Sequence, residues 1–166
     1  MKNGTSALQR EIRQSKPFRS AGQEGILGLL RTADLVRRSL AEVLEPFDVT
    51  PQQYNVLRIL RGAGSAGLPT LAIGERMLEE APGVTRLIDR LEVKGLVRRE
   101  RSPQDRRQVL CRLTSAGHDL VGRIDAPMDE ADGAALAMLS PEDQIELIRL
   151  LDAIRAGHRD FLKQDH

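Results

Sequence analysis

The sequence predicts a mainly α-helical fold that also contains one small β-hairpin. Apolar residues recur at helical spacing along most of the chain, whereas two short segments, 96–101 and 108–113, have the composition of strands. The residues between these strands, 102–105, have the Ser-Pro-Gln-Asp sequence of a turn. Two short helices precede this hairpin, so the pattern predicts a helix-turn-helix with an appended wing, which is a winged helix.

The chain is expected to consist of an N-terminal arm and one domain. Residues 1–21 contain basic residues but no apolar central region, which predicts a flexible arm and not a secretory signal. Residues 22–166 are expected to form a single domain with the winged helix at about 51–113. The flanking segments, about 22–47 and 115–162, are predicted to be dimerisation helices.

The segment 22–47 is predicted to be one long amphipathic helix, because its apolar residues follow a period of about 3.6. A second helix starts after Thr50, the expected N-cap, with Pro51 in its first turn. Gln53 lies where the side chain of a capping box would reach back to the N-cap. This helix runs to Gly62, and a flexible glycine-rich connection follows.

Leu68 and Pro69 are predicted to form a short extended piece that can pair with the hairpin. Thr70 is expected to cap the next helix, which continues to Met77. Gly74 lies in the middle of that helix, where a small residue lets the following helix cross closely.

The helix predicted over residues 82–95 has two distinct faces. Pro82 suits its first turn, and Gly95 suits a left-handed C-cap. Apolar residues at positions i, i+3, i+4 and i+7 form a buried stripe, and the polar residues between them face away. The buried stripe consists of Val84, Leu87, Ile88 and Leu91, and the opposite face of Thr85, Arg86, Asp89 and Arg90.

Two further helices are predicted after the hairpin. Thr114 caps a helix that starts at Ser115 and that Pro127 should kink or break. The segment 140–143, Ser-Pro-Glu-Asp, starts the last helix. The outer helices are too long for a small winged helix to cover, so their apolar faces need a second surface, which a two-fold dimer supplies.

Charge is distributed unevenly, although the whole chain has a formal net charge of +1. Residues 82–112 contain nine Lys or Arg and four Asp or Glu, whereas residues 113–166 contain five and eleven. A local basic patch on a nearly neutral protein is expected of a surface that binds a polyanion. The patch coincides with a helix and hairpin that can contact two grooves of a DNA duplex; the alternative is ordinary solvated surface charge.

Composition argues against several other classes of protein. The single cysteine excludes an internal disulfide, and without spaced Cys/His sets we expect no metal and no cofactor. No apolar run reaches the length of a membrane span, so a cytoplasmic protein is expected. No nucleophile–base set or phosphate loop indicates an enzyme. Cys111 alternates with Val109 and Leu113, which favours a buried structural thiol over a redox sensor.

Four segments carry motifs: TPQQYNVL at 50–57, VTRLIDRLEVKGLVRR at 84–99, DRR at 105–107 and LTSAG at 113–117. Together they resemble the MarR family of bacterial transcriptional regulators, over about residues 24–155. The resemblance implies a winged-helix homodimer that binds double-stranded DNA at a palindromic operator and usually represses. Many members release DNA when a small, often phenolic or carboxylate ligand enters a cleft between the dimer part and the DNA-binding part.

By this resemblance, the helix at 82–95 enters the major groove and the hairpin tip reaches the minor groove. Arg106 is the preferred minor-groove residue, and Asp105 is expected to hold Arg106 or an arginine of the helix in position. Members commonly have hydroxyl residues where this chain has Ala81-Pro82-Gly83, so backbone N–H groups must make more of the phosphate contacts. The predicted DNA-binding residues are Gly83, Thr85, Arg86, Arg90, Asp105, Arg106 and Arg107.

Some roles stay open in the sequence. The strand arginines are either general phosphate contacts or solvated charges, and no ligand-binding residue is assigned. A second possible function is a winged-helix module that binds only other proteins, against which the basic wing tip argues. The strand arginines are Arg98, Arg99, Arg101 and Arg112; polar candidates near the expected ligand cleft are Arg37, Arg38, Tyr54, Arg58 and His118.

Overall fold

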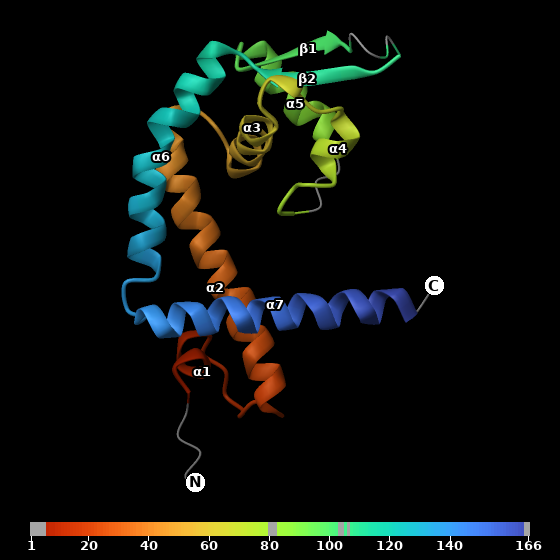
Figure 1. The fold of residues 1–166 in the computed structure, drawn as a ribbon. Helices are drawn as coiled ribbons and strands as arrows, with labels where there is room; N and C mark the ends of the chain where they lie inside the picture. Colours follow the sequence, from red (N-terminus) through yellow and green to blue (C-terminus); the bar gives the residue numbers. More distant parts are fainter. Residues whose placement is uncertain (1–5, 80–82, 103–104, 106, 165–166) are drawn as a thin grey trace. The chain divides into compact units, whose positions relative to one another are not determined.

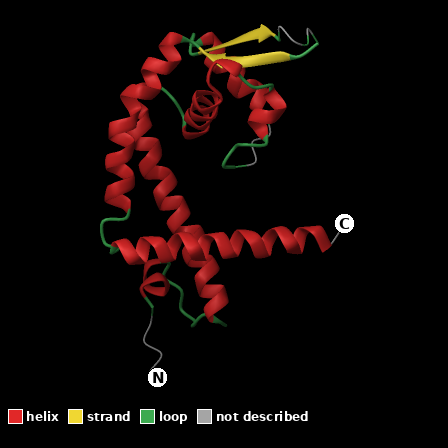
Figure 2. Cartoon of the chain, in the orientation of Figure 1, coloured by secondary structure: helices red, strands yellow, loops and turns green. Residues whose placement is uncertain are grey.

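The computed structural model describes residues 6–79, 83–102, 105 and 107–164, with side chains described as far as residue 158. The chain forms two compact units, which divide between residues 125 and 126, and each unit is treated by itself. Helices dominate and the one sheet is a two-stranded hairpin, so the predicted fold class is confirmed (Figures 1 and 2). The elements are α1 (Ala7–Glu11), α2 (Ala21–Leu44), η1 (Glu45–Phe47), α3 (Pro51–Ala63), η2 (Gly64–Ala66), α4 (Thr70–Gly74), α5 (Val84–Val93), β1 (Val97–Arg101), β2 (Val109–Leu113), α6 (Ser115–Ala135) and α7 (Pro141–Gln164).

Helix α3 begins with the capping box that the sequence predicts. The hydroxyl of Thr50 accepts a hydrogen bond from the backbone N–H of Gln53 at 3.2 Å, and the Gln53 side chain accepts one from the N–H of Thr50 at 3.0 Å. Pro51 occupies the first turn, where its missing N–H leaves no bond unmade. These contacts satisfy two of the N–H groups that a helix start leaves open.

The core of the first unit lies between α3, α4, α5 and the hairpin. Helix α3 packs against α5, α2 and β2, and α5 packs against α4 and β1. Cys111 is buried, as predicted. The most deeply buried side chains of this core are Val56, Leu57 and Leu60 of α3, Ile73 of α4, Ile88 and Leu91 of α5, and Val97 and Cys111 of the hairpin.

The hairpin is antiparallel, with Val97 opposite Leu113 and Arg101 opposite Val109. Leu68 pairs with Cys111 outside the hairpin: the Leu68 N–H donates to the Cys111 carbonyl at 3.0 Å, and the reverse bond is 2.8 Å. The predicted extended piece at 68–69 is therefore confirmed. A Cβ on Gly67 would lie 2.7 Å from the Cys111 carbonyl oxygen, which leaves room only for glycine.

Thr114 joins the two ends of the hairpin. Its hydroxyl accepts from the N–H of Gly117 at 3.0 Å, which confirms it as the cap of α6, and also donates to the carbonyl of Gly95 at 2.7 Å. Its own N–H donates to the carbonyl of Leu96 at 3.1 Å. Gly95 has φ +69°, as a left-handed C-cap after α5 requires.

Helix α4 differs from the sequence prediction at both ends. Pro69 occupies the N-cap position and no side chain caps the helix, so the predicted cap by Thr70 is wrong. Thr70 is already helical, and its hydroxyl lies 3.9 Å from the Sγ of Cys111. The helix ends at Gly74 and does not reach Met77, so Gly74 is its last residue and not its middle.

The described part of the predicted flexible arm, residues 6–20, contains helix α1 and an ion pair to α2. The Ser6 hydroxyl caps α1, and the Arg31 Nε donates to Glu11 Oε1 at 2.7 Å. The arm is thus partly helical, because an ion pair and the packing of Leu8 near Gly28 hold α1 against α2.

In the second unit, α7 starts where the sequence predicts. The Ser140 hydroxyl accepts from the N–H of Asp143 at 3.1 Å, and the Asp143 carboxylate accepts from the N–H of Ser140 at 3.3 Å. Helix α6 continues through Pro127, so the predicted break is not found. Within the described residues, no helix has the length and apolar content needed to cross a membrane.

Candidate nucleic-acid interface

Helix α5 separates a buried face from a charged face, as its spacing predicts. Leu87, Ile88 and Leu91 are buried in the core, whereas Val84, which the sequence predicts to be buried with them, is only half-buried. The residues that the sequence placed on the opposite face, Thr85, Arg86, Asp89 and Arg90, are all exposed. One helix therefore packs on the winged-helix core while presenting hydroxyl and guanidinium groups outward.

The side chains of Arg86 and Arg90 make no hydrogen bond or ion pair with any residue that the structure describes. Both side chains are exposed. A guanidinium group in this state keeps its five N–H donors for an external acceptor, such as guanine or a phosphate.

Gly83 is the N-cap of α5 and has φ +103°, in the left-handed region that favours glycine. No side chain among the described residues caps this helix start. Its first N–H groups are therefore suited to an anion, as the sequence predicts for this position. The preceding residues, 80–82, lie outside the described residues, and so does the predicted first-turn role of Pro82.

The wing tip is shaped by Asp105. Its carboxylate accepts from the backbone N–H of Arg107 at 2.9 Å, and its own N–H donates to the Ser102 hydroxyl at 3.3 Å. The sequence predicts that Asp105 holds Arg106 or an arginine of the helix in position, which stays a prediction because Arg106 is not among the described residues. Among those residues, the Asp105 side chain bonds to the backbone two residues along the chain. Arg107 is exposed, and Arg106 lies outside the described residues.

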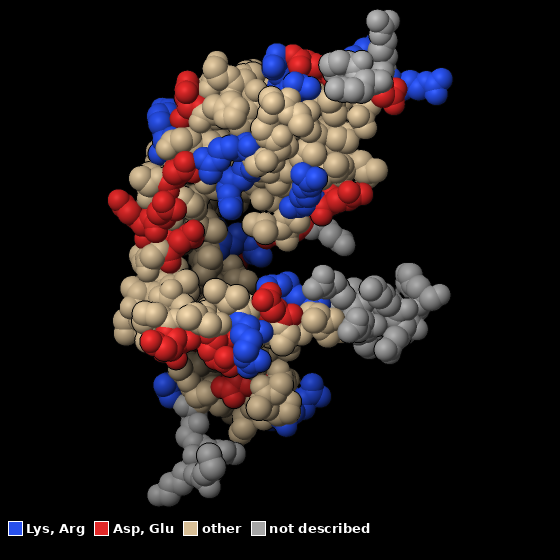
Figure 3. Space-filling model, in the orientation of Figure 1, with Lys and Arg blue, Asp and Glu red and all other residues tan. Residues whose placement is uncertain are grey.

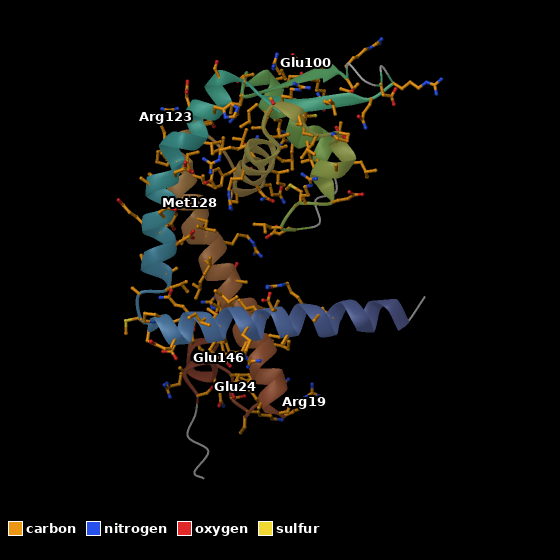
Figure 4. All side chains as sticks on the ribbon, viewed as in Figure 1. Arg19, Glu24, Glu100, Arg123, Met128 and Glu146 are labelled. Atoms are coloured by element: carbon orange, nitrogen blue, oxygen red, sulfur yellow. The ribbon has the colours of Figure 1, made fainter. Side chains whose placement is uncertain are left out.

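Lys and Arg side chains are visible around the hairpin in the space-filling view, together with acidic ones (Figure 3). Several of the strand arginines are paired with these acids. Arg98 and Arg112 both contact Glu100, which is labelled on the hairpin in Figure 4. Arg101 is exposed.

Arg99 has a different position from the other strand arginines. Its Nη2 lies 2.7 Å from Asp89 Oδ1 and its Nη1 lies 2.6 Å from Glu92 Oε2, and both carboxylates belong to α5. Burial opposes the charge of Arg99, but the hydrogen bonds to Asp89 and Glu92 outweigh it and raise the pKa of the guanidinium. Sequence reasoning left this residue as a phosphate contact or a solvated charge and missed the ion pairs.

The five polar candidates for a ligand site do not form one cluster. Arg37 pairs with Glu79 at 2.8 Å, and Arg38 pairs with Asp34 at 2.8 Å on its own helix. Arg58 lies 5.9 Å from the ring centre of Tyr54, which is buried, and His118 is exposed. Two surface grooves of about 560 and 620 Å³ adjoin α5, and none of the five candidates lines either of them.

Comparisons with known proteins match this chain to one family and to solved structures of similar fold. Residues 49–109 match the model of the MarR family. A MarR transcription factor from Planctomyces limnophilus is 40% identical, and the match covers 82% of this chain and 99% of that chain with a TM-score of 0.63. MepR of S. aureus, solved as a DNA complex, is 27% identical over 78% of this chain and 95% of its own, with a TM-score of 0.71.

The PcaV transcriptional regulator from Streptomyces coelicolor was solved with its natural ligand. It is 25% identical to this chain, and the match covers 75% of this chain and 89% of PcaV with a TM-score of 0.63. Curated relatives are likewise named as transcriptional regulators and not as enzymes, which agrees with the sequence prediction. The family match, the identity to the Planctomyces protein and the shared winged-helix fold lead to one conclusion: the chain belongs to the MarR family of transcriptional regulators.

Proposed function

We propose that the chain is a homodimeric repressor that binds a palindromic operator in double-stranded DNA and is released from it by a small molecule. The observation that carries the proposal is the outer face of α5, where the side chains of Arg86 and Arg90 are exposed and have no hydrogen-bond or ion-pair partner among the described residues. Helix α5 enters the major groove, and Thr85, Arg86 and Arg90 contact bases or phosphates there.

The other predicted site residues extend this contact. Backbone N–H groups at Gly83 bind a phosphate at the start of α5. The wing tip reaches the minor groove, where Arg106 and Arg107 supply the charge and Asp105 fixes the turn that carries them. The DNA complex of MepR supports this arrangement, since that protein shares the fold at 27% identity.

Dimerisation through the outer helices is supported by exposed apolar side chains on each of them. Helix α7 exposes Ile145, Ile148, Leu150 and Ile154, and α2 separately exposes Ile26 and Leu30. Isolated exposed apolar residues are ordinary, but four of them on one helix indicate a contact surface. The two-fold symmetry of such a dimer matches a palindromic operator, with half-site centres about 10 bp apart or a multiple of it.

Release by a small molecule is supported by the family and by the solved complex of PcaV with its natural ligand. We propose a phenolic or carboxylate ligand, in keeping with the resemblance. None of the residues described here is assigned to that ligand.

The test starts with a genome-wide DNA pull-down using the full chain, followed by titration of the recovered operators. Arg86→Ala should reduce the preference for operator over random DNA by about 5- to 150-fold, because a bidentate arginine–guanine contact is worth about 1–3 kcal/mol. Arg106→Ala should weaken binding to all DNA sequences. It should also reduce the salt slope, which is the slope of log affinity against log salt concentration, by about one. Addition of aromatic acids should release the wild-type protein.

Arg123→Ala is the matched control, because Arg123 is an exposed arginine of α6 that Figure 4 places away from the hairpin tip. It should bind like the wild type. If Arg86→Ala and Arg106→Ala also bind like the wild type, the assignment of α5 and the wing is wrong. A wild-type protein that shows no preference for any recovered sequence would instead favour a module that binds only proteins.

A further inference from the structure

We propose that Arg99 is a positioning residue, which fixes the wing to α5 and offsets part of the negative charge of two carboxylates on the helix that faces DNA. The proposal rests on the proposed function, because it concerns how the same surface is prepared for a polyanion. It assigns to Arg99 an internal role and no direct contact with phosphate.

The first step is the geometry of the guanidinium group. Its two terminal nitrogens reach two different carboxylates of α5, Asp89 at 2.7 Å and Glu92 at 2.6 Å. Nη2 also lies 3.4 Å from the carbonyl oxygen of Thr85. The side chain is 23% exposed, so its donors are directed at the helix and little of the group is left for an external anion.

The second step is the backbone of β1. The N–H of Arg99 donates to Glu92 Oε1 at 3.1 Å, while Glu92 Oε2 accepts from the Arg99 guanidinium. One carboxylate therefore binds both the main chain and the side chain of the same strand residue. Arg99 lies in the middle of β1, opposite Cys111, so these bonds fix the centre of the hairpin against α5.

The third step is the charge of the helix surface. Asp89 and Glu92 lie in the same helix as Arg86 and Arg90, and each carboxylate is about half exposed. Without Arg99, two uncompensated negative charges would stand beside the groups that approach phosphates. Like charges at this range repel a polyanion, and pairing with Arg99 lowers the net charge of this group from −2 to −1.

The experiment compares Arg99→Gln with Arg98→Gln in the full chain. Both variants lose one positive charge from adjacent strand residues, but Arg98 pairs with Glu100 inside the hairpin and not with α5. We expect Arg99→Gln to lower operator affinity at least tenfold at low salt and by less at high salt, because salt screens the two exposed carboxylates. We also expect faster amide hydrogen exchange in β1 and β2 without DNA, whereas Arg98→Gln exchanges like the wild type.

Two further variants separate position from charge. Arg99→Lys keeps the charge but cannot span both carboxylates, so its affinity and exchange rates should lie between those of the wild type and Arg99→Gln. In the triple variant Arg99→Gln/Asp89→Asn/Glu92→Gln, the repulsive carboxylates are also gone. It should regain part of the lost affinity while its hairpin amides still exchange rapidly.

A loss of operator affinity in Arg99→Gln with unchanged hydrogen exchange would mean that Arg99 contacts phosphate directly and would overturn the proposal. Lack of any affinity gain in the triple variant would overturn the charge part. If the wild type binds no operator, the proposed function fails separately, and the exchange comparison still decides whether Arg99 fixes the hairpin.

Discussion

At the scale of single residues, Gly117 is the described glycine with the least space for a side chain. A Cβ at this position would lie 2.2 Å from the carbonyl oxygen of Leu96 and 3.2 Å from a methyl carbon of Leu113. The close approach lets the first turn of α6 sit directly on the segment that links α5 to the wing. Gly122, in the same helix, has no atom within 4 Å of the corresponding point.

We therefore predict opposite effects of alanine at these two positions. Gly117→Ala should lower the free energy of unfolding by about 1–3 kcal/mol, because the added methyl group pushes against backbone. Gly122→Ala should raise it by about 0.5–1 kcal/mol, since alanine loses less conformational entropy than glycine in a helix. Urea unfolding at one fixed protein concentration measures both; equal effects of the two changes would contradict the contact at Leu96.

Residue by residue, the sequence predicts what local spacing determines. The two faces of α5 follow from the positions of Leu87, Ile88 and Leu91, and the left-handed Gly95 follows from its place after the helix. The role of Arg99 does not follow in this way, because its partners, Asp89 and Glu92, lie on another element. Only the return of the chain along β1 brings these charges together, so the alternation of residues within the strand does not predict the ion pairs of Arg99.

At the scale of elements, the start of α3 can be tested in isolation from the DNA-binding surface. Thr50→Ala should lower the free energy of unfolding by about 1 kcal/mol, because it removes the side-chain half of the capping box. Gln52→Ala is the control, since Gln52 is an exposed residue of the same turn that takes no part in the box. A matching loss in the control, measured by urea unfolding, would show that the capping box does not stabilise the helix.

Elements were predictable where a local signal decides their boundary. The capping box at Thr50 and the Ser140 cap of α7 are of this kind, because each bond spans only three residues. Helix α4 was not, since Thr70 resembles a cap but the preceding Pro69 already has the extended N-cap conformation. Pairing of Leu68 with Cys111 fixes the chain just before α4, so a long-range contact decides where the helix begins.

At the scale of the whole molecule, the length of α2 and α7 predicted that their apolar faces need another surface. Ile148 of α7 is 60% exposed, and exposed aliphatic side chains are a suitable core for a contact between two copies. The same pattern that predicts a helix therefore also predicts an assembly.

We predict that Ile148→Glu converts a dimer into a monomer, because burying an unpaired carboxylate in an apolar contact is strongly unfavourable. Sedimentation velocity at matched concentrations should show the mass halved relative to the wild type. Val93→Glu is the control, since Val93 is 89% exposed on α5 and introduces the same charge away from the outer helices. A monomeric wild type, or a variant that stays dimeric, would contradict the proposed contact.

The hydrogen bonds of Thr114 couple the movements of α5 and α6. By bonding to Gly95 and Leu96, it closes the hairpin at its base, so the last turn of α5 and the first turn of α6 are attached at one point. The hydrogen bonds of Thr114 connect these two turns directly, so a rotation of one turn also rotates the other. A molecule that tilts the first turn of α6 by a few degrees would thereby also turn α5, without any rearrangement of the wing itself.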